Sequence, residues 1–530
     1  MPRARPKRRP CLERLGALPH NGSAGRQPAA VTGADVMAAS FFVLAIVFVL
    51  NYGALLAAFG EEMSVAALQR LGGSVVAVGG LVALGLVYLA RFQRRLVRTG
   101  RQLLVFGACC LAAAAMAKLL LYLDGRVAPE WRSLVYLTPL SGLAIFFAVV
   151  YGQREGIAAC IILALLVGLT VQARDEARQS YGREHPSLAA SPYADQPQDA
   201  EALPVAVVLM SGALVAVLAS RRIRKRTKLL NVGLLVGATH VALLVGFYLL
   251  RGRLSLDRMI PYELAWGVAN GLGVAVVMTI LLPVIEVVFN VATDIRLLEL
   301  SDQDQTLLRY LVTLTPSTDN HSRRVALLAE AAAEAVGANS LLALVGSYYH
   351  DIGKMPKPEF FIENQSSKIS PHDRLRPSLS ALIIVGHVKD GVELAREAKL
   401  PRAIIDIIAQ HHGTSAIEFF YNRYLEEAGD KPLLDAEFFR YPGPKPATKE
   451  AAIIMLADAV EAASRTLSEP LPSRIHTLIR KISAAKLLDG QFEECHLTLS
   501  ELHVIEQCFF RVLCAMYHAR IEYPSTSNLR

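Results

Sequence analysis

The stretch Leu341-Leu342-Ala343-Leu344-Val345-Gly346-Ser347-Tyr348-Tyr349-His350-Asp351-Ile352-Gly353-Lys354 joins an apolar run to two metal-ligand side chains. The run from Leu341 to Val345 predicts a helix that packs into a core. A histidine and a carboxylate at the end of such a helix are costly to bury unless a proton, a partner or an ion compensates. A His-Asp pair alone is a weak signal, because it occurs by chance in many chains. The small Gly353 allows the backbone to turn after the pair.

The same arrangement returns at His411-His412, which ends the amphipathic run from Ile404 to Ile408 and precedes Gly413. Adjacent residues project about 100° apart on a helix, so two neighbours reach one ion only near a helix end or the edge of a cluster. The recurrence favours a metal centre over a chance pair.

Three further side chains of ligand type lie in the same part of the chain: His321 before the first pair, His387 between the two pairs, and Asp458 after the second pair. Asp458 lies within the apolar run 453–460, so its helix is predicted to be largely buried. A metal would satisfy this carboxylate, and the alternative is an ion pair with a base such as Arg465. Taken alone, His321 is better explained as a histidine at a helix terminus.

The motifs around these residues are His321-Ser322, His350-Asp351-Ile352-Gly353-Lys354, Gly386-His387-Val388-Lys389-Asp390-Gly391, His411-His412-Gly413-Thr414 and Leu456-Ala457-Asp458. In this order they resemble the seven-transmembrane HD-domain phosphohydrolases, and most closely the PgpH type, whose members hydrolyse cyclic di-AMP. The likeness extends to the stretches 360–365, 441–446 and 488–491, and it covers about residues 260 to 525.

The resemblance implies an all-helical HD domain that holds two divalent transition-metal ions. The first ion would be bound by His321, His350, Asp351 and Asp458. The second would be bound by His387, His411 and His412, with Asp351 bridging. Imidazole-rich sites suit iron or manganese better than magnesium. Two such ions can activate water for attack on phosphorus.

Asp351 and Lys354 are the predicted catalytic residues. Asp351 is the implied bridging ligand, and Lys354 has the position to hold a phosphate oxygen as a point charge. An ordinary exposed lysine is an equal alternative for Lys354.

Hydrophobicity assigns the N-terminal half to a membrane. A mean hydropathy of +0.35 and a hydrophobic content of 53% exceed what a soluble chain of this length would show. Eight spans are predicted, at about residues 36–59, 65–90, 102–123, 134–151, 156–172, 204–220, 229–250 and 262–290. The expected fold class is all-α: a basic segment over residues 1–35, a polytopic helical membrane bundle over 36–294 and a helical HD domain over 295–530.

Basic residues predict the orientation of this bundle. They cluster before the first span, after the second and after the sixth, at residues 3–9, 91–101 and 221–228. All three clusters share one side only if the number of spans is even, and the positive-inside rule makes that side cytoplasmic. The acidic loop 173–203 then faces outward. A multi-pass bacterial inner-membrane protein is expected, with its N-terminus and HD domain in the cytoplasm.

The same basic runs account for most of the net charge of +8 and the pI of about 9.1. Each run abuts a span, so anionic membrane lipid is a better partner for it than a DNA or RNA polymer.

The chain departs from the family pattern in two places. Members usually carry a sizeable extracellular domain after the first span, whereas only residues 60–64 separate the first two spans here. Asn320 replaces the histidine that commonly precedes the ligand corresponding to His321.

The expected function is hydrolysis of cyclic di-AMP to the linear dinucleotide pApA by a membrane-bound, metal-dependent phosphodiesterase. The alternatives are an HD hydrolase of another nucleotide, a non-catalytic nucleotide receptor and a transporter. The complete ligand set argues against a receptor, and the lack of paired charges in mid-membrane argues against a transporter. The oligomeric state and the residues that read the base stay open.

Overall fold

The structure is a computed structural model that describes residues 45–46, 72–73, 76, 79–80, 100–123, 133–184, 202–221, 223–251, 260–365, 370–429 and 434–518. The predicted N-terminal segment, most of the first two predicted spans and most of the acidic loop lie outside these residues. The described elements are all helices, with one isolated β-bridge between Ala416 and Arg440. The predicted all-α fold class is therefore confirmed.

The chain divides into two compact units. The first comprises residues 1–122 and 165–202, and the second comprises residues 123–164 and 203–530. The described part of the first unit consists mainly of α3 (Gly100–Leu123) and the C-terminal part of α5 (Gln153–Glu184). Both helices are apolar over a length that suits a membrane.

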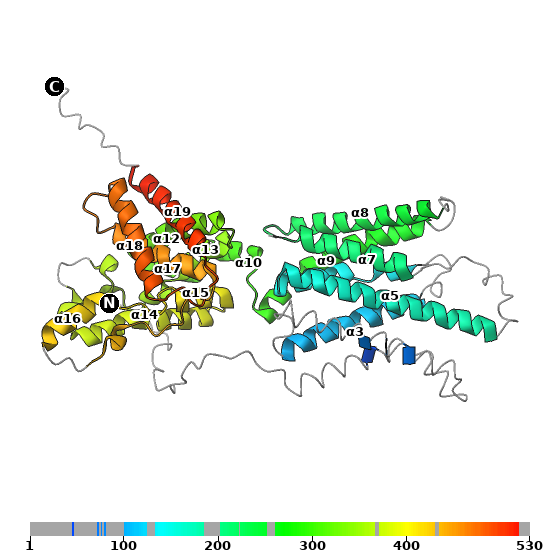
Figure 1. The fold of residues 1–530 in the computed structure, drawn as a ribbon, viewed down its shortest axis with the longest axis horizontal. Coiled ribbons are helices and arrows are strands. Elements are labelled where there is room, and N and C mark those ends of the chain that lie inside the picture. Colours follow the sequence, from blue (N-terminus) through cyan, green and yellow to red (C-terminus); the bar gives the residue numbers. More distant parts are fainter. Residues whose placement is uncertain are drawn as a thin grey trace, which may run out of the picture. The chain divides into compact units, whose positions relative to one another are not determined.

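The second unit opens with a helical bundle made of η2 (Leu134–Leu137), α4 (Leu140–Val150), the start of α5, α7 (Ala202–Ala219), α8 (Thr227–Leu250) and α9 (Ile260–Phe289). Helices α8 and α9 lie side by side (Figure 1). Their backbones approach closely because Gly233 faces Gly271, where a Cβ on either glycine would overlap the carbonyl oxygen of the other. Asn270 of α9 ties η2 to the bundle by donating to Tyr136 O at 2.7 Å and Thr138 O at 2.9 Å.

Five described helices are long and apolar enough to cross a membrane: Gln102–Leu123, Gln153–Arg174, Ala202–Ala219, Thr227–Leu250 and Tyr262–Phe289. They correspond to the third, fifth, sixth, seventh and eighth predicted spans. The fourth predicted span differs, because Pro139 separates η2 from α4. Helix α4 has 11 residues. At 1.5 Å per residue it extends about 16 Å, which is shorter than a hydrocarbon core of about 30 Å.

The C-terminal part of the second unit is the helical region predicted as the HD domain. Its helices are α10 (Asp294–Leu300), α11 (Thr306–Leu314), α12 (Pro316–Ala335), α13 (Ser340–Tyr349), α14 (Pro377–Glu397), α15 (Arg402–Gln410), α16 (Glu418–Ala428), α17 (Lys449–Ser464), α18 (Pro472–Leu488) and α19 (Leu499–His518). Short 3₁₀ turns η3 (Ile352–Lys354), η4 (Pro358–Phe360), η5 (Ile362–Asn364), η6 (Pro371–Arg374) and η7 (Ala436–Phe439) connect them.

Helix α17 lies at the centre of this region, where it packs against α12, α13, α15 and α18. Its apolar residues from Ile453 to Ala457 are almost fully buried. This burial confirms the prediction for the helix that carries Asp458. A second core joins α10, α11, α13 and α15. The two helices that end at the pairs His350-Asp351 and His411-His412 therefore pack against the same apolar residues.

Candidate metal centre

Both predicted ligand pairs lie at helix ends. Helix α13 ends at Tyr349, with His350 as its C-cap and Asp351 directly after it. Helix α15 ends at Gln410, and His411 and His412 follow. The chain then turns at Gly413, whose φ is +54°. Adjacent side chains on a helix project about 100° apart. At a helix end, both members of a pair can therefore reach the edge of one site.

Gly353 has a different role from the one predicted. Its φ lies outside the left-handed region, so the turn after Asp351 does not require glycine. A Cβ at Gly353 would instead overlap the carbonyl oxygen of His387 and lie 2.5 Å from Gly391 N. The absent side chain thus allows η3 to lie against α14, which brings His387 to Asp351.

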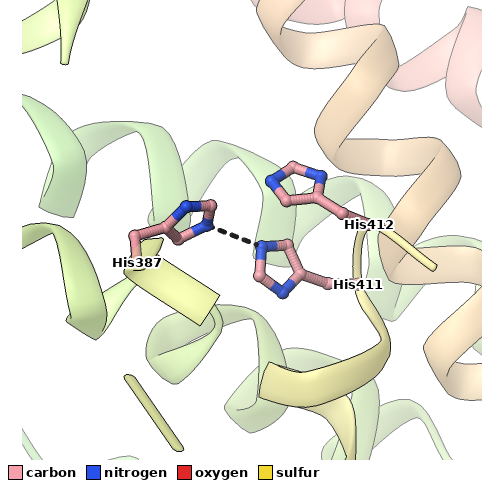
Figure 2. A group of neighbouring side chains, drawn as sticks. All are labelled: His387, His411 and His412. Atoms are coloured by element: carbon pink, nitrogen blue, oxygen red, sulfur yellow. Dashed lines mark hydrogen bonds between the residues drawn. The ribbon is translucent and has the colours of Figure 1, made fainter. Parts of the chain in front are cut away.

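The ligand-type residues form two groups. One contains His321, His350 and Asp458, and the other contains His387, His411 and His412. Within each group the ligand atoms all lie within 4.8 Å of one another. Figure 2 shows the second group, in which His387 comes from α14 and its Nε2 lies 3.3 Å from His411 Nε2.

Asp351 lies between the two groups and is 1% exposed. Its Oδ2 is 3.2 Å from His350 Nε2 and 3.7 Å from His321 Nε2. Its Oδ1 is 3.4 Å from His387 Nε2 and 3.7 Å from His411 Nε2. Each carboxylate oxygen therefore faces one group, which is the arrangement that a bridging ligand requires.

Three of the imidazoles are oriented in the same way. Each Nδ1 lies near the carbonyl oxygen three residues earlier: His350 at 2.7 Å from Ser347 O, His387 at 2.6 Å from Ile384 O, and His411 at 2.7 Å from Ile408 O. A carbonyl only accepts, so the proton belongs on Nδ1 and the lone pair on Nε2. Every one of these lone pairs is then available to a metal ion.

His321 is held by two carboxylates of α17. Its Nε2 lies 2.9 Å from Asp458 Oδ1, and its Nδ1 lies 2.5 Å from Glu461 Oε2. Arg465 pairs with Glu461, with Nε 2.8 Å from Oε1. The alternative in which Arg465 neutralises Asp458 is therefore wrong. Sequence reasoning missed Glu461 as a member of the site, although it follows Asp458 by three residues and shares its helix face.

The charge states suit cation binding. Burial, reinforced by His350, lowers the pKa of His411 to about 3, and burial together with His411 keeps the pKa of His412 well below its usual value. Burial would raise the pKa of Asp351, but His350 and Lys354 hold it well below its ordinary range. Burial would likewise raise the pKa of Asp458, but the hydrogen bond from His321 and the nearby charges of His412, His321 and His350 together hold it well below its ordinary range. Neutral His411 and His412 thus lie beside ionised carboxylates. Burial would also lower the pKa of His321, but hydrogen bonds to Asp458 and Glu461 raise it to about 9, so an ion would have to displace a proton from its Nε2.

Lys354 is directed into the site. Its side chain is 13% exposed, and Nζ lies 2.7 Å from Asp351 Oδ2 and 2.8 Å from Glu363 Oε1. These two carboxylates outweigh the effect of burial and raise the pKa of Lys354, so its charge is retained. The exposed-lysine alternative is wrong. Glu363 is a second residue whose role sequence reasoning missed.

Two stretches matched to the family without an assigned role also reach the site. The ring of Tyr441 lies 4.3 Å from that of His412, centroid to centroid. Gln491 is fully buried and holds the turn after His412, accepting from Thr414 N at 3.0 Å and donating to Thr414 Oγ1 at 2.9 Å. The likeness of residues 441–446 and 488–491 to the family was the signal that could have found them.

The donor set fits two transition-metal ions. Among the described residues, His350 Nε2 and Asp351 Oδ1 are buried without a hydrogen bond, and Asp351 Oδ2 is paired with the ammonium of Lys354. Buried polar atoms are rarely left without a hydrogen bond, and unpaired imidazole and carboxylate donors are what such ions require. The groups His321, His350, Asp458 and His387, His411, His412 would each hold one ion, with Asp351 shared.

Comparison with known proteins defines the class. Residues 68–293 match the model of the 7TM receptor with intracellular HD hydrolase, and residues 318–463 match the HD domain. The chain belongs to this family of membrane proteins with an HD hydrolase domain.

Particular relatives agree with this class. The cyclic-di-AMP phosphodiesterase PgpH of Bacillus subtilis is 35% identical over 460 residues, which is 87% of this chain and 61% of the relative. The protein of the same name from Listeria monocytogenes is 32% identical over 460 residues, 87% of this chain and 60% of the relative. This chain therefore spans about three-fifths of the length of these relatives.

Crystal structures of the L. monocytogenes PgpH HD domain, alone and in complex with cyclic-di-AMP, are 45% identical to this chain. They cover 41% of this chain and 100% of the HD-domain chain, with TM-scores of 0.39 and 0.40.

Proposed function

We propose that the chain is a membrane-bound, metal-dependent phosphodiesterase that hydrolyses cyclic di-AMP to linear pApA. The observation that supports this most is the position of Asp351, which directs one oxygen to each of two groups of metal ligands. Cyclic di-AMP is proposed as the substrate because the PgpH relatives are named as cyclic-di-AMP phosphodiesterases.

The first ion would be held by His321, His350, Asp351 and Asp458, and the second by Asp351, His387, His411 and His412. Manganese or iron suits these ligands. When bound, the ions supply Lewis acidity and a water of lowered pKa.

The residues of the chain prepare this chemistry before the substrate arrives. Asp351 and Asp458 are already ionised, and the lone pairs of His350, His387 and His411 already point to the centre. Little rearrangement is then needed to form the ligand sets. Lys354 carries its positive charge at the same place, where it would contact a phosphoryl oxygen and stabilise the negative charge that develops there.

The proposed reaction opens the ring at one phosphodiester. Water adds to phosphorus, the bond from phosphorus to the ribose 3′ oxygen breaks, and that oxygen takes a proton. The product is a linear dinucleotide with a 5′ phosphate. The second phosphodiester then belongs to a more flexible molecule, so its cleavage is expected to be slower.

We further propose a bacterial inner-membrane location with the N-terminus and the HD domain in the cytoplasm. The domain limits would be 1–35, 36–294 and 295–530. Two features support the last boundary: α9 ends at Phe289 and α10 begins at Asp294. Anionic lipid is the proposed partner of the basic runs, with no role for a nucleic-acid polymer.

The test is a hydrolysis assay on the full chain in lipid nanodiscs, loaded anaerobically with manganese. Cyclic di-AMP should give a linear dinucleotide as the main early product and should be turned over faster than cyclic di-GMP. Mononucleotide that appears without a linear intermediate contradicts the reaction, and faster turnover of cyclic di-GMP contradicts the substrate. Binding of cyclic di-AMP without any product would instead favour the receptor alternative.

A further inference from the structure

His321 differs from the other buried ligands in the group that orients it. Three imidazoles of the site present Nδ1 to a backbone carbonyl of their own helix. His321 presents Nδ1 to a carboxylate, Glu461 Oε2 at 2.5 Å, which comes from a helix 140 residues later in the chain.

Glu461 is built into this position. It is 1% exposed, and its two oxygens have different partners: Oε2 faces His321, while Oε1 lies 2.8 Å from Arg465 Nε and 3.7 Å from Arg324 Nη1. The arginine pairing offsets part of the cost of burying the carboxylate. Asp458 and Glu461 are three residues apart on α17, so they share a face and hold the His321 ring from both nitrogens.

We propose that Glu461 is a positioning residue that orients His321 and strengthens it as a donor, making the first metal position the tighter of the two. This inference rests on the proposed function, because it takes His321 to be a metal ligand. A carboxylate that accepts from Nδ1–H fixes the tautomer and raises the basicity of Nε2. The first group also contains Asp458, whereas the second contains no carboxylate beyond the shared Asp351.

The competing explanation is an ion pair that only stabilises α17. Arg465 follows Glu461 by four residues on this helix, and such pairs occur without any link to a site. The two explanations differ in what Arg465→Gln does. This change removes the ion pair but leaves the contact between Glu461 and His321.

The experiment measures manganese binding by the metal-free full chain in detergent, using chelator competition and the paramagnetic resonance signal of free Mn²⁺. The wild type should bind in two steps of different affinity. Glu461→Gln keeps an acceptor but loses its charge, and should weaken the tighter step by about 10- to 100-fold with little change in the other. Glu461→Ala should weaken it at least as much.

Two variants serve as controls. Arg465→Gln should bind manganese nearly as the wild type does. Glu450→Gln changes another carboxylate of α17, which is not one of the proposed ligands. Its Oε1 accepts from Asn339 N at 2.7 Å, and the change should also leave both binding steps intact. Circular dichroism checks folding, and if Glu461→Ala does not fold, Glu461→Gln decides the matter alone.

The proposal is overturned if Glu461→Gln binds both ions with wild-type affinity, if it weakens both steps equally, or if Arg465→Gln produces the same loss. Hydrolysis is not the readout. A wild-type chain that binds two ions but does not hydrolyse cyclic di-AMP would refute the proposed function and leave the role of Glu461 standing. Hydrolysis together with unaltered binding by Glu461→Gln would refute only this inference.

Discussion

One carboxylate oxygen of the proposed bridging residue, Asp351 Oδ2, lies close to both a lysine and a histidine. It lies 2.7 Å from Lys354 Nζ and 3.2 Å from His350 Nε2, on the side of the first ligand group. An ion bound there would compete with the ammonium for this oxygen. Glu363, 2.8 Å from Nζ, gives Lys354 a second partner. The lysine can therefore stay charged at the site while Asp351 serves as a ligand.

Replacing this lysine should separate metal binding from turnover. Lys354→Gln removes the positive charge without removing a ligand, so we expect hydrolysis of cyclic di-AMP to fall on the order of 10²-fold while both ions stay bound. Steady-state rates and metal content on the same sample would check this. Lys357→Gln is the matched control, because Lys357 is 53% exposed and should leave the rate unchanged. A rate near wild type for Lys354→Gln would show that the charge is not used.

Gly413 combines two constraints at one residue. Its φ of +54° strains any L side chain, and a Cβ would also overlap Gln491 Oε1. Gly413→Ala should therefore lower the free energy of unfolding by about 2 kcal/mol and weaken the His387, His411, His412 group. Thermal unfolding and metal counting would measure the two effects. Gly337→Ala has a similar φ of +69° with nothing within 4 Å, so it should cost less and leave metal binding intact. Equal effects of the two changes would contradict the role of Gln491.

At the element scale, the contact between η3 and α14 brings the two ligand groups together. The three atoms nearest to a Cβ placed at Gly353 are backbone atoms of His387 and Gly391. This contact places His387 at 3.4 Å from Asp351 Oδ1. The distance between the groups thus depends on one residue without a side chain.

A methyl group at this contact should separate the elements. Gly353→Ala is expected to destabilise the fold by about 1–3 kcal/mol or more, because backbone atoms cannot move aside as a side chain does, and to reduce the second ion selectively. Gly386→Ala changes the residue next to His387 on α14, where nothing lies within 4 Å. That control should be neutral or stabilising by up to about 1 kcal/mol. If both variants unfold at the same temperature, the proposed close approach is wrong.

The sequence predicted where the helices of the site end and which of them is buried, but not the contacts between distant segments. Apolar runs followed by ligand pairs predicted that α13 and α15 end at the site, and the apolar surroundings of Asp458 predicted the burial of α17. Periodicity indicates which face of a helix is buried but not which helix covers it. Glu461 facing His321, and Gln491 facing Thr414, are contacts between segments far apart in the chain. Gly353 was misjudged for the same reason, since its neighbour is a helix that begins 24 residues later.

At the scale of the whole molecule, charge links the membrane bundle to the helices that follow it. The basic run between α7 and α8 includes Arg224, 3.8 Å from Asp294, and Arg226, 3.6 Å from Glu299. Both acidic residues belong to α10, which follows α9 directly. This agrees with the prediction that the sixth and eighth spans end on the same side of the membrane.

Fusion reporters would test the topology. Reporters placed after Arg101 and Lys228 should read cytoplasmic, and one near Ala190 should read outside. The result at Ala190 depends on the fourth predicted span, which is divided into η2 and α4. If residues 134–150 did not cross the membrane, the acidic loop would lie on the cytoplasmic side. An outside signal at Lys228 would refute the even number of spans.

We proposed that Asp351 joins two metal positions into one phosphodiesterase site. The most direct measurement compares the wild-type full chain with Asp351→Ala in nanodiscs, recording metal content, helicity and the products formed from cyclic di-AMP. The wild type should bind about two ions and release the linear dinucleotide, whereas Asp351→Ala should retain the helical fold and form no product. Near wild-type turnover by Asp351→Ala, or fewer than about one ion in the wild type after anaerobic manganese or iron loading, would contradict the account.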